Sequence, residues 1–465
     1  MIYLNSFEIF MLLINFSYIV TIKFDTDHAV IFKPPKVNHN HQAFGSSVAI
    51  TKSKDRIRFI IGAPKGSSNL ITIPQTGLVY SCVVNDNWKS SECNEIQLDL
   101  KNNSKLVKIK TPFTSGMNLG LNLAVDQVNN LITICGHLHA YNNQQPTGIC
   151  FLVDTINDKL VKILSPRSRK SLTSNSIKKT SFKSLQSHEM FGFSSTFNHN
   201  SDSIVFGIPG FDIFRGAILS LTNNLNHQQS ANITVNTIKE LDQDSYLGYS
   251  LATGIFFKSR VELIVVGAPR GKQLKGQVII MSPNSDDYYG EIIQDLDGHQ
   301  LGEYFGYSIQ SIDLNADGYD DLLIGAPFYM PKNNPRGDCG QVYVYFSDGQ
   351  QLNESPITID GDSLFGSRFG SSLATIGDFD SDGFNDFAVG APQENEGSGS
   401  VYIYSGSTIK SSRKYFQKID SSKSFGLSSF GSSIYSTIDV DNDNCPDLLI
   451  GCSMSDAAVL LRCQS

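Results

Sequence analysis

The chain has 465 residues, of which 40% are hydrophobic and 18% are charged, and it carries a formal net charge of −8 at pH 7. This balance excludes the basic footprint of a nucleic-acid-binding protein, and the apolar content suits a folded core. The length alone suggests about three domains, but a repeat that runs through the chain predicts a single domain instead.

The first predicted element is an apolar run at residues 9–22, IFMLLINFSYIVTI. It is short for a membrane span and suits the hydrophobic part of a secretory signal, so we expect residues 1–22 to be a signal peptide. Glu8 precedes the run, no Lys or Arg stands before it and no clear cleavage motif follows, so a buried strand is the alternative. Residues 23–465 then form the folded domain.

Two short motifs alternate along the rest of the chain, and each occurs seven times. The first is Phe or Leu followed by glycine, and the second is an apolar residue followed by glycine and often by Ala-Pro. Most repeats continue with alternating apolar residues, as in GQVYVYF from Gly340, which is the period of short antiparallel strands. The glycines of the first motif are Gly45, Gly120, Gly192, Gly248, Gly306, Gly370 and Gly431, and those of the second are Gly62, Gly136, Gly207, Gly267, Gly325, Gly390 and Gly451.

Each repeat is long enough for one four-stranded antiparallel sheet. Seven such sheets arranged around an axis make a β-propeller, so the predicted fold class is all-β with seven blades. The last repeat stops before its fourth strand, whereas a surplus segment, TIKFDTDHAVIFKP, precedes the first repeat. We expect this N-terminal strand to complete the last blade and close the ring, because closure removes an exposed strand edge. The single Trp residue and the lack of a sialidase motif argue against other propeller families.

Eight cysteines and three glycosylation motifs in residues 23–465 indicate an extracellular protein. The glycosylation motifs lie at Asn102, Asn232 and Asn353. The expected disulfides, around predicted hairpins, are Cys82 with Cys93 and Cys135 with Cys150, and a weaker candidate pair is Cys452 with Cys463. Cys339 and Cys445 are left without an assignment.

Two further segments have both a structural and a functional interpretation. Residues 165–183, SPRSRKSLTSNSIKKTSFK, are rich in Lys and Arg and contain no acidic residue. They are either a solvated linker between blades or a loop that contacts a ligand. His137 and His139 alternate beside Gly136, so they either hold a metal ion or form a polar strand end.

Three acidic loops occupy the fifth to seventh repeats, each directly before a buried strand. In DFDSDGFND, from Asp378, carboxylates stand at positions one, three, five and nine, and glycine at position six permits a tight turn. Oxygen ligands of this kind favour Ca²⁺. An EF-hand begins in the same way but needs Glu at position twelve, where this chain has Val389. In the third loop Asn444 replaces the turn glycine, and asparagine tolerates the left-handed conformation.

We therefore expect three structural Ca²⁺ ions, because each loop would otherwise hold mutually repelling carboxylates. An ordinary polar turn is the alternative for one loop, but three loops in register argue against it. The expected ligands, which include the backbone carbonyl group at position seven, are Asp313, Asn315, Asp317, Tyr319 and Asp321; Asp378, Asp380, Asp382, Phe384 and Asp386; and Asp439, Asp441, Asp443, Cys445 and Asp447.

The seven FG and GAP motifs, the acidic loops of the last three repeats and the N-terminal FDTDHAVIF together resemble the head of an integrin α subunit. The resemblance covers nearly the whole chain. It implies Ca²⁺ on the lower face of a propeller, an integrin β subunit on the upper face, and a matrix or cell-surface protein ligand bound at their junction. The interval from Val153 to Met190 is too short for the inserted I domain of some family members. The fourth repeat, at GIFFKSRVE from Gly254, has lost the acidic ligands.

The resemblance also implies a partner site. Phe193, Tyr249 and Tyr307 match aromatic residues that surround a basic residue of the β subunit, whereas Ser46 and Ser432 replace aromatic residues found in many family members. The alternative is that the three rings fill the narrow end of the propeller.

The resemblance bears on the ligand as well. Family members that bind Arg-Gly-Asp use an acidic residue and an aromatic residue near segment 165–183. This segment lacks the acid, and Ile213 stands where the aromatic residue is expected, so we expect an acidic ligand or another ligand without Arg-Gly-Asp if the segment contacts one.

The resulting functional prediction is an adhesion-receptor head. Family members continue into leg domains and a transmembrane helix, so both a fragment at the cell surface and a secreted relative are open. The alternative function is a stand-alone secreted propeller that acts as a lectin or protein-binding module. No catalytic residues are expected, because neither a nucleophile elbow nor a metalloprotease helix is present.

Overall fold

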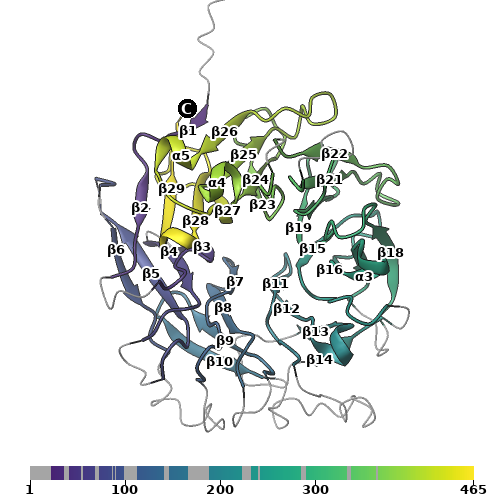
Figure 1. The fold of residues 1–465 in the computed structure, drawn as a ribbon, viewed down its shortest axis with the longest axis horizontal. Coiled ribbons are helices and arrows are strands. Elements are labelled where there is room, and N and C mark those ends of the chain that lie inside the picture. Colours follow the sequence, from purple (N-terminus) through teal and green to yellow (C-terminus); the bar gives the residue numbers. More distant parts are fainter. Residues whose placement is uncertain are drawn as a thin grey trace, which may run out of the picture.

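The computed structural model describes residues 22–35, 41–53, 56–68, 73–85, 87–89, 91–98, 113–140, 146–165, 188–222, 232–238, 241–283, 290–331, 337–362 and 365–464. These residues form seven four-stranded antiparallel sheets arranged around a central opening (Figure 1). The predicted all-β, seven-bladed propeller is confirmed.

Within each blade the strands pair in an unbroken order. Blades 1 to 3 contain β3 (Ser47–Ser53), β4 (Arg56–Ala63), β5 (Leu78–Val84) and β6 (Ser91–Glu95); β7 (Asn122–Asp126), β8 (Leu131–Gly136), β9 (Ile149–Asp154) and β10 (Lys159–Leu164); and β11 (Ser195–Phe197), β12 (Ser203–Ile208), β13 (Ala217–Thr222) and β14 (Asn232–Asn236). Blades 4 to 6 contain β15 (Leu251–Gly254), β16 (Leu263–Ala268), β17 (Gln277–Met281) and β18 (Ile292–Asp297); β19 (Ser308–Ile312), β20 (Asp321–Ala326), β21 (Gln341–Tyr345) and β22 (Ile357–Asp360); and β23 (Ser372–Gly377), β24 (Asp386–Ala391), β25 (Ser400–Tyr404) and β26 (Gln417–Asp420).

Blade 7 combines the two ends of the chain. Its strands are β27 (Phe430–Ile438), β28 (Asp447–Cys452), β29 (Ala457–Leu461) and the N-terminal β2 (Val30–Phe32). Strand β2 pairs antiparallel with β29, with Ile31 opposite Val459. A second pair, β1 (Lys23–Phe24) with β30 (Cys463–Gln464), reinforces the seam. The prediction that an N-terminal strand closes the ring is therefore confirmed.

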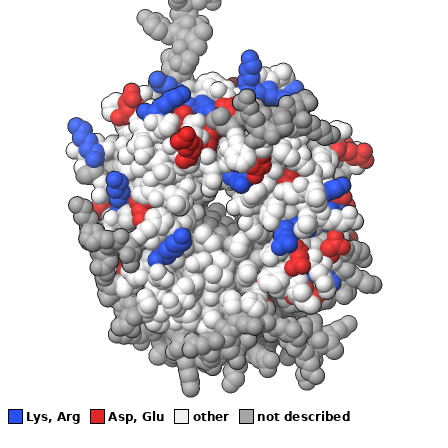
Figure 2. Space-filling view, in the orientation of Figure 1, with Lys and Arg blue, Asp and Glu red and all other residues white. Residues whose placement is uncertain are grey.

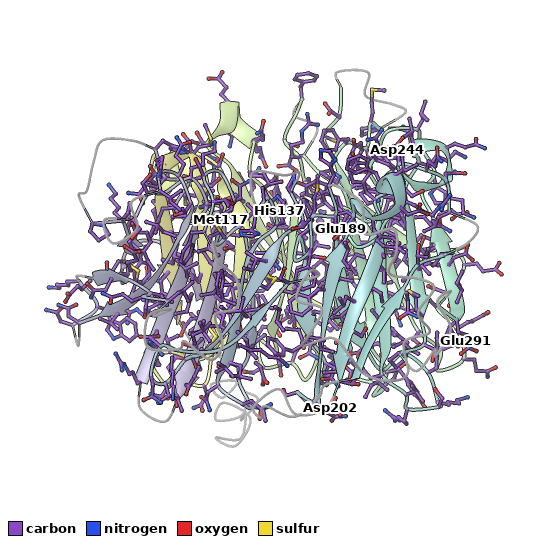
Figure 3. All side chains as sticks on the ribbon, turned by 90° about the horizontal axis from the view of Figure 1, so that it is seen from below. Met117, His137, Glu189, Asp202, Asp244 and Glu291 are labelled. Carbon is purple, nitrogen blue, oxygen red and sulfur yellow. A yellow bond between two sulfur atoms is a disulfide. The ribbon has the colours of Figure 1, made fainter. Side chains whose placement is uncertain are left out.

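Short helical turns lie between strands at the ends of the blades. They are α2 (Phe211–Phe214), α3 (Gly271–Leu274), α4 (Glu394–Gly397), α5 (Ser421–Ser424) and η3 (Ser453–Ser455). We call their side, which includes Asp244, the upper face, and the opposite side, which includes Asp202, the lower face (Figure 3). Within the described ranges, no helix is both long and apolar enough to cross a membrane.

A ring of hydrogen bonds around the channel joins each blade to the next. The residue two positions after the glycine of the first motif is serine in six blades and asparagine in blade 2, and its side chain donates to the carbonyl oxygen of the equivalent glycine in the following blade. Ser250 Oγ, for example, lies 2.7 Å from the carbonyl oxygen of Gly306. The other pairs are Ser47 with Gly120, Asn122 with Gly192, Ser194 with Gly248, Ser308 with Gly370, Ser372 with Gly431 and Ser433 with Gly45.

The glycine of the second motif makes this close approach possible. A Cβ atom built on Gly325 would overlap the carbonyl oxygen of Gly370 and the hydroxyl of Ser308. The Phe or Leu of the first motif is buried in all seven blades, as at Phe305, and anchors the same turn in the core. The repeated sequence thus encodes the spacing between blades.

Both expected hairpin disulfides are present, Cys82 with Cys93 and Cys135 with Cys150. A third disulfide joins Cys445 to Cys463, so the predicted pair of Cys452 with Cys463 is wrong. In the antiparallel register of β28 with β29, Cys452 lies opposite Ala457 at the upper end. Cys463 follows β29 at the lower end, beside the loop that contains Cys445. Cys339 and Cys452 are free and buried.

Several predicted features lie partly or wholly beyond the described residues. Residues 1–21 of the expected signal peptide, Asn102, and residues 166–183 of the basic segment belong to this group. Of the other two glycosylation motifs, Asn232 is the first residue of β14 and Asn353 is exposed.

We expect Gly325→Ala to lower the free energy of unfolding by about 3 kcal/mol or more, because Cβ would collide with atoms that hold two blades together. Gly302→Ala is the matched control, since a Cβ atom there meets nothing within 4 Å. The free energy of unfolding of Gly302→Ala should fall by roughly 1–2 kcal/mol, because alanine is disfavoured in the left-handed backbone conformation at this position. Chemical denaturation of both variants measures the difference, and equal losses would contradict the proposed reason for the motif.

Candidate cation loops and the aromatic mouth of the channel

The three acidic loops connect the first and second strands of blades 5, 6 and 7 on the lower face. We call them loop 5 (residues 313–321), loop 6 (378–386) and loop 7 (439–447). Each loop ends where a fully buried strand begins, at β20, β24 or β28. The sequence therefore positions each set of carboxylates at a rigid edge.

The first aspartate of each loop folds the chain back on itself. In loop 6 the two carboxylate oxygens of Asp378 accept the backbone N–H groups of Asp382 at 2.9 Å and Gly383 at 3.0 Å. Asp313 and Asp439 accept the same two N–H groups in loops 5 and 7. The turn residue has a left-handed backbone in all three loops, and Asn444 adopts it with φ 69°. The tight turn that the sequence predicts at position six is thus present in all three loops.

The ninth aspartate ties each loop to the blade. In loop 6, Asp386 Oδ2 accepts the N–H of Phe379 at 2.9 Å, and its Oδ1 accepts the N–H of Gly406, after the third strand, at 2.9 Å. Asp321 and Asp447 make the equivalent pairs of bonds. Burial raises the pKa of Asp321, Asp386 and Asp447 to about 7. Each is a buried carboxylate whose charged form needs compensation.

The third position gives the clearest sign that the loops fit a cation. Asp380 Oδ1 and Asp441 Oδ1 are buried, and neither has a hydrogen-bond partner among the described residues. Burial, together with the charges of Asp382 and Asp378, raises the pKa of Asp380. Unpaired buried carboxylate oxygens are costly, so a bound cation is the natural partner.

The carboxylates also converge in space. Oxygen atoms of Asp378, Asp380 and Asp382 lie within 4.8 Å of one another, and so do those of Asp439, Asp441 and Asp447. Loop 5 differs because its third residue is neutral, and Asn315 Oδ1 accepts the N–H of Asp317 at 3.2 Å. The all-oxygen donor set fits a hard divalent cation in each loop.

Three basic residues near these loops were missed by the sequence analysis. Arg260, from the fourth repeat, donates from Nη1 to the carbonyl oxygen of Gly318 at 2.6 Å, and its guanidinium lies 4.6 Å from the ring centroid of Tyr319. Lys52 and Arg462 contact loop 7. Arg260 and Lys52 belong to other blades than the loops they contact, and Arg462 lies 21 residues after Asp441 in the same blade, so the loop sequence alone gives no signal of these contacts.

On the upper face, aromatic rings form a continuous row at the mouth of the channel. The ring centroids of Phe193 and Tyr249 are 4.7 Å apart, and those of Tyr249 and Tyr307 are 5.2 Å apart. The structure thus brings together the three predicted partner-binding residues. Burial raises the pKa of Tyr249, so its hydroxyl is neutral at physiological pH.

His137 extends this row, which the sequence analysis did not predict. Its ring contacts Phe193 edge-on at 5.0 Å. Burial lowers its pKa to about 4, so the imidazole is neutral at pH 7. His137 stands where several repeats have the Ala of the second motif, and this substitution was the available signal. Neither His137 nor His139 belongs to a metal-ligand group in the described part of the chain.

The other four blades contribute three serines and, in blade 2, Leu121 to the mouth. Ser46, Ser371 and Ser432 occupy the positions equivalent to Tyr249 in blades 1, 6 and 7. Ser46 Oγ and Ser371 Oγ each donate locally, at 2.7 Å, to the carbonyl oxygens of Ala43 and Arg368. The surface around the central opening carries few charged side chains in Figure 2.

The upper-face loops also expose large apolar side chains. They are Ile213, Leu274, Leu301, Met330, Phe365 and Met454. Neighbouring loops are joined, since the N–H of Gly302 donates to the carbonyl oxygen of Leu274 at 2.8 Å and Gln300 Nε2 donates to that of Met330 at 2.8 Å. Such exposed apolar side chains on one face are typical of protein contact surfaces.

Comparison with known proteins agrees with this arrangement. The FG-GAP repeat family matches residues 305–345 and 369–404. Integrin alpha-4 of Xenopus laevis is 30% identical over 429 residues, which cover 90% of this chain and 40% of the relative. Integrin alpha-8 of Mus musculus is 31% identical, with 92% and 40% covered, and integrin alpha-PS2 of Drosophila melanogaster is 28% identical, with 91% and 32% covered. The chain thus spans two fifths or less of the length of these relatives.

We expect Asp380→Asn to have opposite effects with and without calcium. In calcium the variant should bind one ion fewer and melt at a lower temperature, because a ligand is lost. In chelator it should melt at a higher temperature than the native protein, because one of several crowded carboxylates is neutralised. Metal analysis and thermal melting in both conditions measure these effects.

Asp202→Asn is the control for this experiment. Asp202 is an exposed carboxylate on the same face, and it accepts a hydrogen bond from Asn198 Nδ2 at 2.7 Å. That variant should keep the native calcium content and the native response to chelator. A native protein that binds no calcium, or that melts at the same temperature in chelator, would refute the assignment of the loops.

Proposed function

The chain carries the N-terminal propeller head of an integrin alpha chain, and from this premise we propose that it pairs with an integrin β subunit to bind matrix or cell-surface ligands. The observation that carries the proposal is the row of rings formed by Phe193, Tyr249 and Tyr307. These residues come from three successive blades and meet at one end of the channel.

The row suits a basic side chain inserted from the partner. A Lys or Arg held over an aromatic face gains roughly 0.5–2 kcal/mol, and more as water is excluded. Ser46, Ser371 and Ser432, from blades 1, 6 and 7 on the opposite side, supply hydroxyl groups that complete the wall together with water. The partner residue would therefore lie off-centre, against blades 3 to 5.

The apolar side chains of the upper loops support a wide contact around this anchor. Leu301 is 70% exposed and Phe365 is 74% exposed, which is costly for large apolar groups that face only water. A β subunit that covers the mouth would bury them. The aromatic anchor at the centre and the apolar rim are the anatomy of a stable protein interface.

We assign Ca²⁺ to loops 5, 6 and 7 in a structural role. Extracellular calcium modules commonly bind in the ~10⁻⁴–10⁻³ M range, so such sites are filled outside cells. The three disulfides and the exposed Asn353 suit the same compartment. We propose residues 1–22 as the signal that directs the chain there, to the cell surface as part of a longer alpha chain or to the medium as a free chain.

Alanine at both Tyr249 and Tyr307 should abolish a complex that the native chain forms with a co-expressed β subunit. The two rings provide most of the aromatic surface, so we expect the affinity to fall at least about tenfold. Tyr415→Ala is the control, because Tyr415 is 42% exposed and lies on the outer hairpin of blade 6. Co-purification and calcium-dependent melting are the measurements.

The possible outcomes separate the two functions. Loss of the complex with an intact calcium-stabilised fold supports the proposed interface. A complex that survives both substitutions refutes the role of the rings. No complex between the native chain and any β subunit from the same source would instead favour a stand-alone secreted propeller.

We expect a short Arg-Gly-Asp peptide to leave adhesion through this receptor unchanged. Ile213 is 64% exposed on the upper face and offers neither a carboxylate nor an aromatic ring for an arginine. A scrambled peptide is the control in an adhesion assay with cells that display the heterodimer. Strong, selective inhibition by the Arg-Gly-Asp peptide would refute this expectation.

A further inference from the structure

Loop 7 differs from loops 5 and 6 in the residue that follows the third strand of its blade. In each blade this residue directly precedes the one whose N–H donates to the ninth aspartate of the loop. The position is therefore structurally equivalent in the three blades. It is occupied by Phe346, Ser405 and Arg462 in blades 5, 6 and 7.

Of these three residues, Arg462 is the one that forms an ion pair with a carboxylate of its loop. Its Nη1 lies 3.4 Å from Asp441 Oδ2, and the two side chains are 24% and 17% exposed. By contrast, Ser405 Oγ lies 3.0 Å from Ser407 Oγ, and the ring of Phe346 lies under the ammonium of Lys410 at 4.0 Å. In the described part of the chain, no Lys or Arg forms an ion pair with a carboxylate of loop 5 or loop 6.

A second cation lies on the other side of loop 7. Lys52 Nζ donates to the carbonyl oxygen of Asp439 at 2.7 Å and to Asn442 Oδ1 at 3.0 Å. Lys52 belongs to β3 of blade 1, so the contact crosses from the first blade to the last. Loop 7 is thus surrounded by two fixed positive charges that loop 6 lacks among its described neighbours.

Arg462 also contacts blade 1. Its guanidinium carbon lies 5.2 Å from the ring centroid of Trp88, in the hairpin between β5 and β6. The next residue, Cys463, forms the disulfide to Cys445 and the β-bridge to Phe24. Arg462 therefore lies at the seam where the N-terminal and C-terminal ends of the chain close the ring.

We propose that Arg462 is a built-in counter-ion of loop 7, which weakens cation binding by this loop relative to loop 6 and keeps the closing seam ordered when calcium is scarce. This inference rests on the proposed role of the loops as cation sites. A divalent ion bound to Asp441 would lie beside the guanidinium, so it must either tolerate a like charge or displace Arg462 from Trp88. Either effect reduces the affinity of loop 7 for a divalent cation.

The same charge compensates the loop when no divalent ion is bound. Asp439, Asp441, Asp443 and the buried Asp447 otherwise place four carboxylates in nine residues. Arg462 neutralises part of this charge and is held by the cation–π contact to Trp88. Loop 6 has the same number of carboxylates but Ser405 in place of the arginine, so calcium removal should disturb loop 6 more than loop 7.

The chain contains a natural reporter for loop 7. Trp88 is the single tryptophan of the sequence, and it contacts Arg462. Terbium(III), which binds oxygen-rich calcium sites, emits when a nearby excited tryptophan transfers energy to it. Excitation at wavelengths that tyrosine does not absorb therefore selects the terbium ion in loop 7.

Two reciprocal substitutions test the proposal in the full chain. Arg462→Ser gives loop 7 the residue of loop 6 and should raise the terbium affinity reported by Trp88 by about tenfold. Ser405→Arg gives loop 6 the residue of loop 7 and should move one calcium ion from the tight to the weak class in calorimetric titrations. Arg413→Ser, at an exposed arginine of blade 6, is the control that should change neither affinity.

Melting temperatures with and without calcium show whether Arg462 acts as a counter-ion or only stabilises the fold. In chelator, Arg462→Ser should melt at a lower temperature than the native protein, and the rise in melting temperature on adding calcium should be larger than in the native protein. A purely structural role would lower stability and cation affinity together. Unchanged or weaker terbium binding by Arg462→Ser would overturn the proposal.

The measurements distinguish a failure of this inference from a failure of the proposed cation sites. If the native chain binds terbium or calcium in loops 5 and 6 while Arg462→Ser leaves loop 7 unaltered, the inference about Arg462 fails and the cation assignment survives. If the native chain binds neither ion in any loop, both fail.

Discussion

The fold depends on the hydrogen bond that a side chain of one blade donates to a glycine carbonyl group of the next. Ser308 Oγ, for example, bonds the carbonyl oxygen of Gly370 at 2.7 Å, and the last bond of the series, from Ser433 to Gly45, closes the ring at 3.0 Å. Six serine hydroxyls and the longer amide contact of Asn122, at 3.4 Å, join all seven neighbouring pairs of blades at the same place in the repeat. In six of the seven repeats the second glycine must lack a Cβ atom to permit this close approach, whereas a Cβ atom on Gly136 of blade 2 would meet Met117 instead; the motifs of those six repeats thus share one cause.

This constraint also explains how function can vary on a fixed scaffold. The residue between the motif glycine and the serine is not needed for the bond between blades, although Ser432 of blade 7 adds a longer bond of 3.4 Å to the carbonyl oxygen of Gly45. In blade 4 it is Tyr249, between Gly248 and Ser250, and in blade 6 it is Ser371. Its side chain lies at the mouth of the channel, so substitutions there change the chemistry offered to a partner without altering blade spacing. The mouth, with three aromatic residues, three serines and Leu121, is an outcome of that freedom.

The sequence was sufficient for features that depend on local pattern. The repeats predicted the blades, the missing last strand predicted closure by the N-terminal segment, and the loop spacing predicted where carboxylates converge. Features that depend on register or on distant segments were not accessible. The partner of Cys463 follows from the antiparallel register of β28 with β29, and the contact of Arg462 with Trp88 joins segments from opposite ends of the chain.

The carboxylate charge of the acidic loops on the lower face can be compensated in two ways, by a bound cation or by a basic side chain of the protein. Each acidic loop places a buried aspartate against a rigid strand, and the burial that raises its pKa to about 7 also makes its charged form costly. An external cation compensates such a loop only while the cation is available. Blades 5 and 6 are held on both sides by continuous chain, so a loosened loop there leaves the ring closed. The ring closes inside blade 7, where the N-terminal strands β1 and β2, which lead into blade 1, are held to β30 and β29 by short strand pairs, hydrogen bonds and side-chain contacts. A guanidinium that belongs to the chain, fixed between Asp441 and Trp88, gives this joint a compensating charge that does not depend on the calcium concentration.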